Sequence, residues 1–337
     1  MSSLFDRLDD LGVSRVIALR HPPSGLKAFL VLDDLTLGPA AGGVRTLSYT
    51  TEAAALQDAA ALARQMTLKC SLAGLDAGGG KLVVLDQPEL DREAAFRWLG
   101  RRITELRCFY TAGDLGTRPE DLEHMAEACP FVETAQLGPA VGRAALRCLE
   151  ALAERFGREV GELTIGVQGA GFIGGHVARA YREAGAELVI ADLIPEKAEA
   201  LAAELDAVTV SAEELAGSQL LDVFAPCGLG GVLTEALVGR LGAWGVCGAA
   251  NAQLAGPGAA EALRKRRIEH VPGVLAGAGA VVQGIGRTRM GLSDPGVLID
   301  ELRSTTSRLL EEAELSSRAP AELAEEWAWE RIELARS

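Results

Sequence analysis

Histidine is scarce in this sequence of 337 residues, and paired cysteines are missing from it. The chain holds four histidines, and none of its six cysteines stands in a CxxC pair. Zinc sites and disulfide frameworks both rely on such clusters. We therefore expect neither a metal site nor a disulfide scaffold, which is typical of a protein from the reducing cytoplasm.

Positive charge is in deficit as well. Lysine and arginine number 33 against 47 aspartate and glutamate residues, so the formal net charge is −14. Because such a surface repels polyanions, nucleic acid is not an expected partner. A membrane is not expected either, since the longest uncharged run, residues 241–260, is interrupted by Gly, Pro, Asn and Gln. The polar start MSSLFDRLDD also differs from the basic and then apolar order of a signal peptide.

The chain is long enough for about two domains, and its patterns change near the middle. Over residues 25–86, strand-like runs surround an amphipathic helix at 51–69. A helix at 144–157, rich in Ala, Leu and Glu, connects this part to the next. After residue 163, short apolar runs alternate with helical segments, which predicts a parallel sheet with right-handed crossovers and helices on both faces.

We therefore expect an α/β fold in three parts. The first is an N-terminal α/β domain over residues 1–140. The second is a doubly wound, Rossmann-type dinucleotide-binding domain over residues 141–315. The third is a C-terminal helix within residues 316–337 that returns to the first domain.

A glycine fingerprint marks the second domain. It follows the strand-like run LTIGV, opens a helix and consists of Gly169, Ala170, Gly171, Phe172, Ile173 and Gly174. Its first glycine permits a sharp turn, its second lets the backbone approach a pyrophosphate, and its third allows close helix packing. Asp192 ends the next strand, 23 residues after Gly169, where an acid bonds the adenosine ribose and repels a 2′-phosphate. NAD is the expected cofactor, FAD is a weaker option, and an unused Rossmann scaffold is the alternative.

Two lysines of the first domain lie beside glycine-rich stretches. Lys69 ends the amphipathic helix, and Lys81 follows three consecutive glycines. Such a stretch suits a ligand lying against bare backbone. If the two ammonium groups met at about 4 Å, their repulsion of about 4 kcal/mol would lower the pKa of one lysine and leave a neutral amine. The other lysine would stay charged and hold a carboxylate. The alternative is that each lysine is a solvated surface charge.

Asp114 ends the strand-like run CFYTAG. A carboxylate in that position is a candidate proton carrier. Its alternative role is to cap a helix, but Thr117 is better placed to cap the helix that starts at Pro119.

Several motifs, taken together, resemble the glutamate/leucine/phenylalanine/valine dehydrogenase family. They are LGPAAGGVR, MTLKCSLAGLDAGGGK, YTAGDLGT, GAGFIGG, DVFAPCGLGGVLT and GAANAQL, in order from about residue 25 to 290. The details are closest to the leucine and phenylalanine branches. The resemblance implies a substrate and oligomerisation domain and an NAD-binding domain with a closable cleft between them. It also implies a homo-oligomer that reversibly converts an L-amino acid to a 2-oxo acid and ammonia.

The resemblance also implies roles for single residues. Lys69 would bind the substrate carboxylate together with the backbone of Gly42 and Gly43, Lys81 would be the catalytic lysine, and Asp114 would carry protons. The nicotinamide half of the cofactor would be lined by Ala225, Pro226, Cys227 and Asn251. A nucleophilic role for Cys227 is disfavoured, because no histidine is near it in the sequence.

Three positions depart from the family pattern. Val141 replaces a threonine, Ala252 replaces an asparagine, and another asparagine is lost within 277–280, at Gly277. Each lost hydrogen bond costs about 0.5–1.5 kcal/mol. These losses leave open a repurposed homologue with a sensing or scaffold role, but two mutually repelling lysines favour catalysis.

The substrate side chain is expected to be apolar. A glutamate enzyme needs a second cation, whereas this chain has small or apolar residues in the motifs, namely Ala41, Leu72, Ala112, Gly113 and Val281. Aromatic and branched aliphatic amino acids both stay open, as does another amine or 2-oxo acid.

Overall fold

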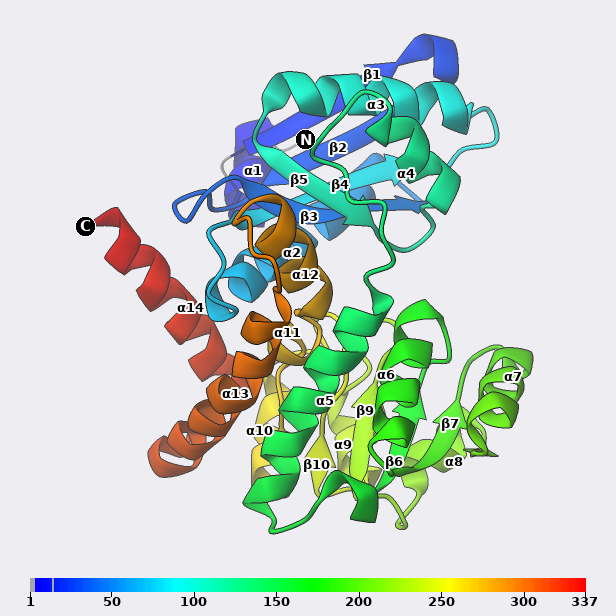
Figure 1. Cartoon of the computed structure of the whole chain (residues 1–337), viewed down its shortest axis with the longest axis vertical. Helices are drawn as coiled ribbons and strands as arrows, with labels where there is room; N and C mark the ends of the chain where they lie inside the picture. The colour runs from blue at the N-terminus through cyan, green and yellow to red at the C-terminus, as the bar shows by residue number, and fades with distance from the viewer. Residues whose placement is uncertain (1–3, 14) are drawn as a thin grey trace. The chain divides into compact units, whose positions relative to one another are not determined.

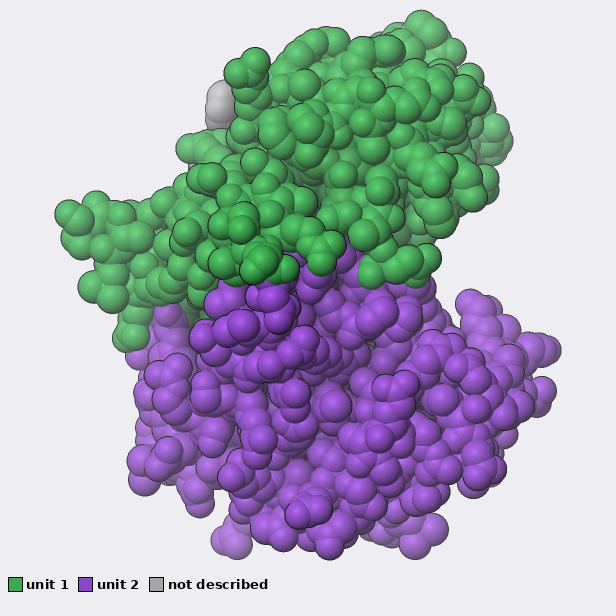
Figure 2. Space-filling model, viewed as in Figure 1, with its two compact units in different colours: residues 1–136, 284–293, 328–337 green, residues 137–283, 294–327 purple. Residues whose placement is uncertain are grey.

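The structure is a computed structural model that describes residues 4–13 and 15–337. The chain divides into two compact units (Figure 2). Unit 1 holds residues 1–136, 284–293 and 328–337, and unit 2 holds residues 137–283 and 294–327. We expected boundaries after residues 140 and 315. The compact units change after residue 136, and residues 328–337 of the C-terminal segment group with unit 1. The predicted domain boundaries stay predictions.

Unit 1 is built on a five-stranded mixed sheet with the order β1-β2-β4-β3-β5 (Figure 1). β3 runs parallel to both β4 and β5, while β2 is antiparallel to β1 and β4. Its elements are α1 (Leu4–Leu11), β1 (Arg15–His21), the 3-10 turn η1 (Pro22–Ser24), β2 (Leu26–Leu32), β3 (Ala40–Leu47), α2 (Glu52–Leu72), β4 (Gly78–Leu85), α3 (Arg92–Leu106), β5 (Phe109–Gly113) and α4 (Pro119–Ala126).

Helices cover both faces of this sheet. Phe96 of α3 and Met125 of α4 pack with Leu82 on one face, and the alanines of α2 pack with Val83 on the other. β4 is consequently buried at every position, including Lys81. A lysine in such a strand has to find its partners inside the protein.

The length and position of α2 follow from its sequence. Thr51 caps its N-terminus, because the Thr51 hydroxyl accepts a hydrogen bond from the amide of Ala54 at 3.1 Å. At the other end, Arg331 donates to the carbonyl oxygens of Ser71 and Leu75 at 3.2 and 3.0 Å. The C-terminal residues 328–337 thereby fix the last turn of α2, which carries Lys69.

The three glycines of β4 are packed against the protein itself. A Cβ at Gly79 would lie 2.2 Å from the Thr67 hydroxyl and 2.3 Å from the Ala63 carbonyl oxygen, both on α2. A Cβ at Gly78 would lie 1.9 Å from the carbonyl oxygen of Asp34. The expectation that a ligand lies against these glycines is therefore wrong. Gly79 lets α2 approach the sheet more closely than any side chain would allow, and Gly78 does the same for the backbone at Asp34.

Unit 2 contains a six-stranded sheet with the order β11-β10-β9-β6-β7-β8, parallel throughout (Figure 1). Its elements are α5 (Gly138–Arg155), the 3-10 turn η2 (Val160–Glu162), β6 (Thr164–Gln168), α6 (Phe172–Glu183), β7 (Glu187–Ala191), α7 (Pro195–Leu205), β8 (Val208–Thr209), α8 (Ala212–Gly217), β9 (Val223–Pro226), α9 (Glu235–Arg240), β10 (Gly245–Val246), α10 (Pro257–Lys265), β11 (Glu269–His270), α11 (Gly273–Ala276) and α13 (Gly296–Ser316). Two further helices, α12 (Gly279–Thr288) and α14 (Pro320–Arg336), contain residues of both units.

Helices lie on both faces of this second sheet. Leu215, Val238 and Leu263, from α8, α9 and α10, pack with Phe224 on one face. On the other face, Leu152 of α5 lies 2.9 Å from where a Cβ at Gly245 would be. The doubly wound α/β fold predicted from the alternating pattern is confirmed. In residues 4–13 and 15–337 no helix is long and apolar enough to span a membrane.

Candidate active site

The side chains of Lys81 and Asp114 meet across the middle of the unit 1 sheet. β3 lies between β4, which carries Lys81, and β5, which ends just before Asp114. The Lys81 Nζ donates to Asp114 Oδ2 at 2.6 Å. Its path crosses Gly43, where a Cβ would lie 3.2 Å from that Nζ and 2.9 Å from the Asp114 Cβ. Glycine at position 43 thus leaves room for the pair.

Lys69 joins this pair from above the sheet. It lies in the last turn of α2, is only 6% exposed, and interacts electrostatically with both Lys81 and Asp114. Lys81 is 4% exposed. The structure therefore brings Lys69, Lys81 and Asp114 together and excludes the alternative that the lysines are solvated surface charges.

Both lysines have a lowered pKa, but the main cause is not the mutual repulsion that we expected. Burial, followed by the positive charge of Lys81, lowers the pKa of Lys69 to about 8. Burial also lowers the pKa of Lys81, against the opposing effect of the Asp114 carboxylate. Desolvation of the ammonium groups, more than their mutual repulsion, produces these shifts.

The carboxyl group of Asp114 is ionised. Burial alone would raise its pKa, but the Lys81 ammonium and the Arg45 guanidinium hold that pKa well below its usual range. The Arg45 Nε donates to Asp114 Oδ2 at 2.9 Å, so both cations contact the same oxygen atom. The proton of the Lys81–Asp114 pair consequently rests on Lys81.

Three residues around this pair were missed in the sequence. Arg45 also binds both carboxylate oxygens of Asp58 on α2, at 3.2 and 3.0 Å, and the Tyr49 hydroxyl donates to Asp58 Oδ2 at 2.5 Å. Arg45 follows Gly43 by two residues on the same strand and so shares its face. Asp58 precedes Lys69 by three helical turns and so shares its face of α2. These two spacings are the features of the sequence from which Arg45 and Asp58 could have been predicted.

The turn after β5 is held by tertiary bonds. We expected Thr117 to cap α4, but the N-cap is Arg118, and the Thr117 hydroxyl donates to the Val44 carbonyl oxygen at 2.7 Å. Arg92 donates to the Gly116 carbonyl oxygen at 2.9 Å. Asp114 does not cap this helix, and its carboxylate is engaged by Lys81 and Arg45 instead.

The glycine fingerprint adopts the turn that its sequence predicts. Gly169 has φ +104° and passes so close to Gly228 that a Cβ would lie 2.7 Å from the Gly228 amide nitrogen. A Cβ at Gly174 would lie 1.8 Å from the Gly169 carbonyl oxygen, so this glycine lets α6 start tightly against the turn. At Gly171 a Cβ would meet no described atom within 4 Å. Two of the glycines serve packing, and the third faces open space.

The start of α6 fits an anionic ligand. Gly171 is the N-cap and offers no side chain to the amides of the first turn, which contains Phe172 and Ile173. Such free amides and the helix dipole attract phosphate groups. Within the described residues, the buried Oε1 of Gln168, beside Gly228 at the same turn, has no hydrogen-bond partner. An amide oxygen accepts hydrogen bonds, so this atom suits a hydroxyl donor and not a phosphate. The amides of the first turn of α6 fit the pyrophosphate of a dinucleotide.

Asp192 lies beside this turn, at the end of β7. Its Oδ2 accepts a hydrogen bond from the Ala170 amide at 2.7 Å, and its Oδ1 accepts one from the Ile194 amide at 2.9 Å. The carboxylate thus joins the fingerprint turn to the loop after β7. Its expected bond to a ribose stays a prediction.

The remaining predicted cofactor residues follow the neighbouring strands. Ala225 and Pro226 end β9, Cys227 comes next, and Asn251 lies in a turn after β10. The amide of Ala250 donates to the Pro226 carbonyl oxygen at 2.9 Å, which ties the two segments together. Burial raises the pKa of the Cys227 thiol to about 12. A thiol with that pKa is a poor nucleophile at neutral pH.

Comparison with known proteins shows the family of this chain. Residues 14–130 match the family model described as Glu/Leu/Phe/Val dehydrogenase, dimerisation domain. The chain is 34% identical to leucine dehydrogenase from Geobacillus stearothermophilus over 291 residues, which cover 83% of this chain and 79% of that one. It is 35% identical to phenylalanine dehydrogenase from Thermoactinomyces intermedius over 302 residues, 84% and 81% of the two chains. The chain belongs to the Glu/Leu/Phe/Val dehydrogenase family.

Solved structures of dehydrogenases share the fold of this family member. The crystal structure of L-tryptophan dehydrogenase from Nostoc punctiforme superposes with a TM-score of 0.80 at 28% identity, covering 99% of each chain. The likeness therefore extends over both units and beyond the residues that the family model matches.

The three departures from the family pattern have different surroundings in this dehydrogenase. Val141 is 3% exposed within α5, and Gly277 is the C-cap residue that follows α11. Ala252 adopts φ +44°, a left-handed conformation that alanine disfavours and asparagine tolerates. At Ala252 the departure thus adds backbone strain to the loss of an amide group.

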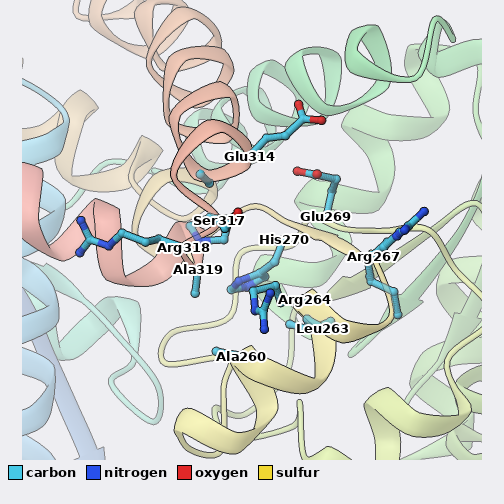
Figure 3. A pocket seen from close by; sticks show the side chains of 13 residues that line it. Ala260, Leu263, Arg264, Arg267, Glu269, His270, Glu314, Ser317, Arg318 and Ala319 are labelled. Atoms are coloured by element: carbon cyan, nitrogen blue, oxygen red, sulfur yellow. The ribbon is translucent and has the colours of Figure 1, made fainter.

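A surface cavity of about 360 Å³ lies elsewhere in unit 2 (Figure 3). It is lined by parts of α10, β11 and the end of α13, and none of its residues belongs to the predicted site. In the described part of the chain, no group of three or more His, Cys, Asp or Glu residues is placed to hold a metal ion. All six cysteines are free.

Proposed function

We propose that this family member is an NAD-dependent dehydrogenase of apolar L-amino acids. The amino acid, water and oxidised cofactor would give the 2-oxo acid, ammonia, reduced cofactor and a proton, reversibly. The observation that carries this proposal is the buried Lys81–Asp114 pair, joined across Gly43 and faced by Lys69. Burying two lysines costs stability, and catalysis offers a reason to retain them.

Lys69 would hold the carboxylate of the substrate, with the backbone of Gly42 and Gly43 beside it. The pKa of Lys69, about 8, leaves most of its side chains charged at pH 7. A bound carboxylate would raise that pKa, because an opposite charge stabilises the ammonium form. Substrate binding therefore keeps Lys69 charged while it excludes water from the pair below.

Lys81 and Asp114 would manage the protons of the reaction. When bound, the nicotinamide would supply the oxidant: it would take the α-hydride from the neutral amine form of the amino acid, which would leave a protonated imine. Lys81 in its neutral form would take a proton from the water that attacks this imine, and then stabilise the developing carbonyl oxygen. The negative charge of the Asp114 carboxylate would stabilise the Lys81 ammonium that forms. Because its own pKa is low, Asp114 would carry the proton only briefly.

NAD is proposed over NADP because of Asp192. The fingerprint Gly169–Gly174 would bind the pyrophosphate, and Ala225, Pro226, Cys227 and Asn251 would flank the nicotinamide. The carboxylate of Asp192, fixed by the Ala170 and Ile194 amides, would repel a 2′-phosphate.

An apolar substrate side chain is supported by the surroundings of Lys81. Ala41 lies on β3 with Gly43, Ala112 pairs with Gly43 from β5, and Leu72 ends α2. The nearest further cation, Arg45, is already bound by Asp58 and Asp114. No cation at these positions serves a second substrate carboxylate, whereas branched aliphatic and aromatic side chains both suit them.

The test is reductive amination, measured as NADH oxidation with ammonia and a panel of 2-oxo acids. Wild type should prefer 4-methyl-2-oxopentanoate, 3-methyl-2-oxobutanoate or an aromatic 2-oxo acid, and Lys81→Ala should lose about 10²–10⁴-fold in kcat. Lys27→Ala, at an exposed lysine of the same unit, is the matched control and should keep full activity. Equal inertness of wild type and Lys81→Ala on every acid would refute the enzyme, and preference for NADPH would refute the role of Asp192.

A further inference from the structure

Arg45 connects the Lys81–Asp114 pair to helix α2. It is 14% exposed, with its Nε on Asp114 and its Nη1 on both oxygens of Asp58. Asp58 is held from a third side by the hydroxyl of Tyr49. Arg45 therefore has one orientation, set by a carboxylate on the helix and a carboxylate beside the sheet.

The two cations on Asp114 have an unusual arrangement. The Lys81 Nζ and the Arg45 Nε donate to the same oxygen, Oδ2, at 2.6 and 2.9 Å. Two donors on one oxygen restrain the rotation of the carboxylate about its Cβ–Cγ bond. In this structure Oδ2 is thereby directed at Lys81.

From this geometry we infer that Arg45, anchored by Asp58, is a positioning residue that holds Asp114 Oδ2 against Lys81 and sets the pH at which Lys81 becomes neutral. This inference rests on the proposed function, in which neutral Lys81 is the active form. Arg45 contacts neither substrate nor cofactor in this scheme and acts through Asp114.

The charges around Lys81 determine the direction of each effect. Lys81 is faced by Asp114 after β5, by Arg45 on β3, and by Asp58 and Lys69 on α2. The positive charge of Arg45 lowers the pKa of Lys81, and the negative charge of Asp58 raises it. Removing Arg45 should therefore raise the pKa of Lys81, and removing the charge of Asp58 should lower it.

The first experiment compares the pH dependence of kcat/KM for oxidative deamination in three variants. Arg45→Gln should shift the acidic limb of the kcat/KM profile to higher pH by about one unit. Asp58→Asn should shift it to lower pH by a smaller amount. Arg45→Lys keeps the charge but cannot bridge two carboxylates, so its limb should stay near that of wild type while kcat falls about tenfold. Arg97→Gln, which removes the two surface ion pairs of Arg97 with Glu93 and Glu127, should leave both the limb and kcat unchanged.

Opposite shifts in Arg45→Gln and Asp58→Asn support the inference, because a merely structural role would lower activity without moving the limb in two directions. Unchanged limbs, or shifts in the same direction, overturn it. If Arg45→Gln does not fold, Asp58→Asn and Arg45→Lys still carry the comparison.

The second experiment does not depend on turnover. Competitive acetylation with acetic anhydride, read at Lys81 and Lys69 by peptide mass spectrometry across pH, reports the neutral fraction of each lysine. The Lys81 profile should shift in the same directions as the limbs. A shifted profile in a chain that turns over no 2-oxo acid would retain the role of Arg45 and refute the proposed function. An unshifted Lys81 profile in an active enzyme would refute the role of Arg45 and retain the proposed function.

Discussion

The substitution Gly43→Ala tests whether the crossing of Lys81 over β3 matters. The added methyl group would lie 2.9 Å from the Asp114 Cβ and 3.2 Å from the Lys81 Nζ. Carbon atoms in contact prefer 3.5–4.0 Å, so Asp114 has to move by roughly 0.6 Å or more. Its Cβ is fixed to the backbone and cannot swing aside. A shift of that size stretches the 2.6 Å bond between Lys81 and Asp114 to about 3.2 Å, the weak end of the normal range for a hydrogen bond.

Gly43→Ala should therefore fold, lose about 1–3 kcal/mol of unfolding free energy, and lose about 10²-fold in kcat. The measurements are urea unfolding and steady-state reductive amination. Gly239→Ala is the matched control, since a Cβ there meets no described atom within 4 Å, and it should keep wild-type kcat. Gly42→Ala should prevent folding, because its methyl group would lie 1.8 Å from the Gly80 carbonyl oxygen. A Gly43→Ala enzyme with kcat within threefold of wild type would show that the alignment of Lys81 and Asp114 is not needed.

Two further predictions concern stability. A pKa of about 8 for Lys69, in place of the ordinary 10.5, corresponds to about 3 kcal/mol, so Lys69→Met should gain up to that amount at pH 7 while losing substrate binding. Below pH 8 both the folded and the unfolded chain carry the proton and the full cost of burying the charge applies; between pH 8 and 10.5 the folded chain loses the proton first, so the advantage of Lys69→Met should shrink. A constant advantage across that range in urea unfolding would contradict the assignment of the low pKa to Lys69. Ala252→Gly should raise the unfolding free energy by about 0.5–1 kcal/mol, because it relieves the φ of +44°; a lower Tm than wild type would argue against strain at that position.

Much of the fold could be predicted because its signals are local. The β6 strand, the fingerprint turn and the start of α6 follow each other within eleven residues, and Gly169 and Gly174 are each required there by a close backbone contact. The pairing of Lys69 with Lys81 was also accessible, since both lie beside a glycine-rich stretch. The unit boundaries were harder to predict, because residues 284–293 belong to unit 1 while the chain on both sides belongs to unit 2.

The rest of the site depends on tertiary register. Arg45 and Asp58 are thirteen residues apart, and their ion pair exists because α2 lies over β3. Thr117 looked like a helix cap, but a bond to the Val44 carbonyl oxygen of a distant strand replaced the local one. The glycines 78–80 looked like a ligand surface because nothing in the sequence reveals that protein atoms fill the space beside them, namely Asp34 at Gly78, Ala63 and Thr67 at Gly79, and Phe109 at Gly80.

That filled space limits how the substrate range of this enzyme can be changed by design. Gly78 and Gly79 are pressed against backbone atoms, and Gly42 against a carbonyl oxygen of the neighbouring strand, so none of them tolerates even a methyl group. A mutant library directed at the floor beneath the lysines would yield mainly unfolded chains. Ala112 and Leu72, which are partly exposed, offer better randomisation sites, because changes there leave the spacing between α2 and β4 intact.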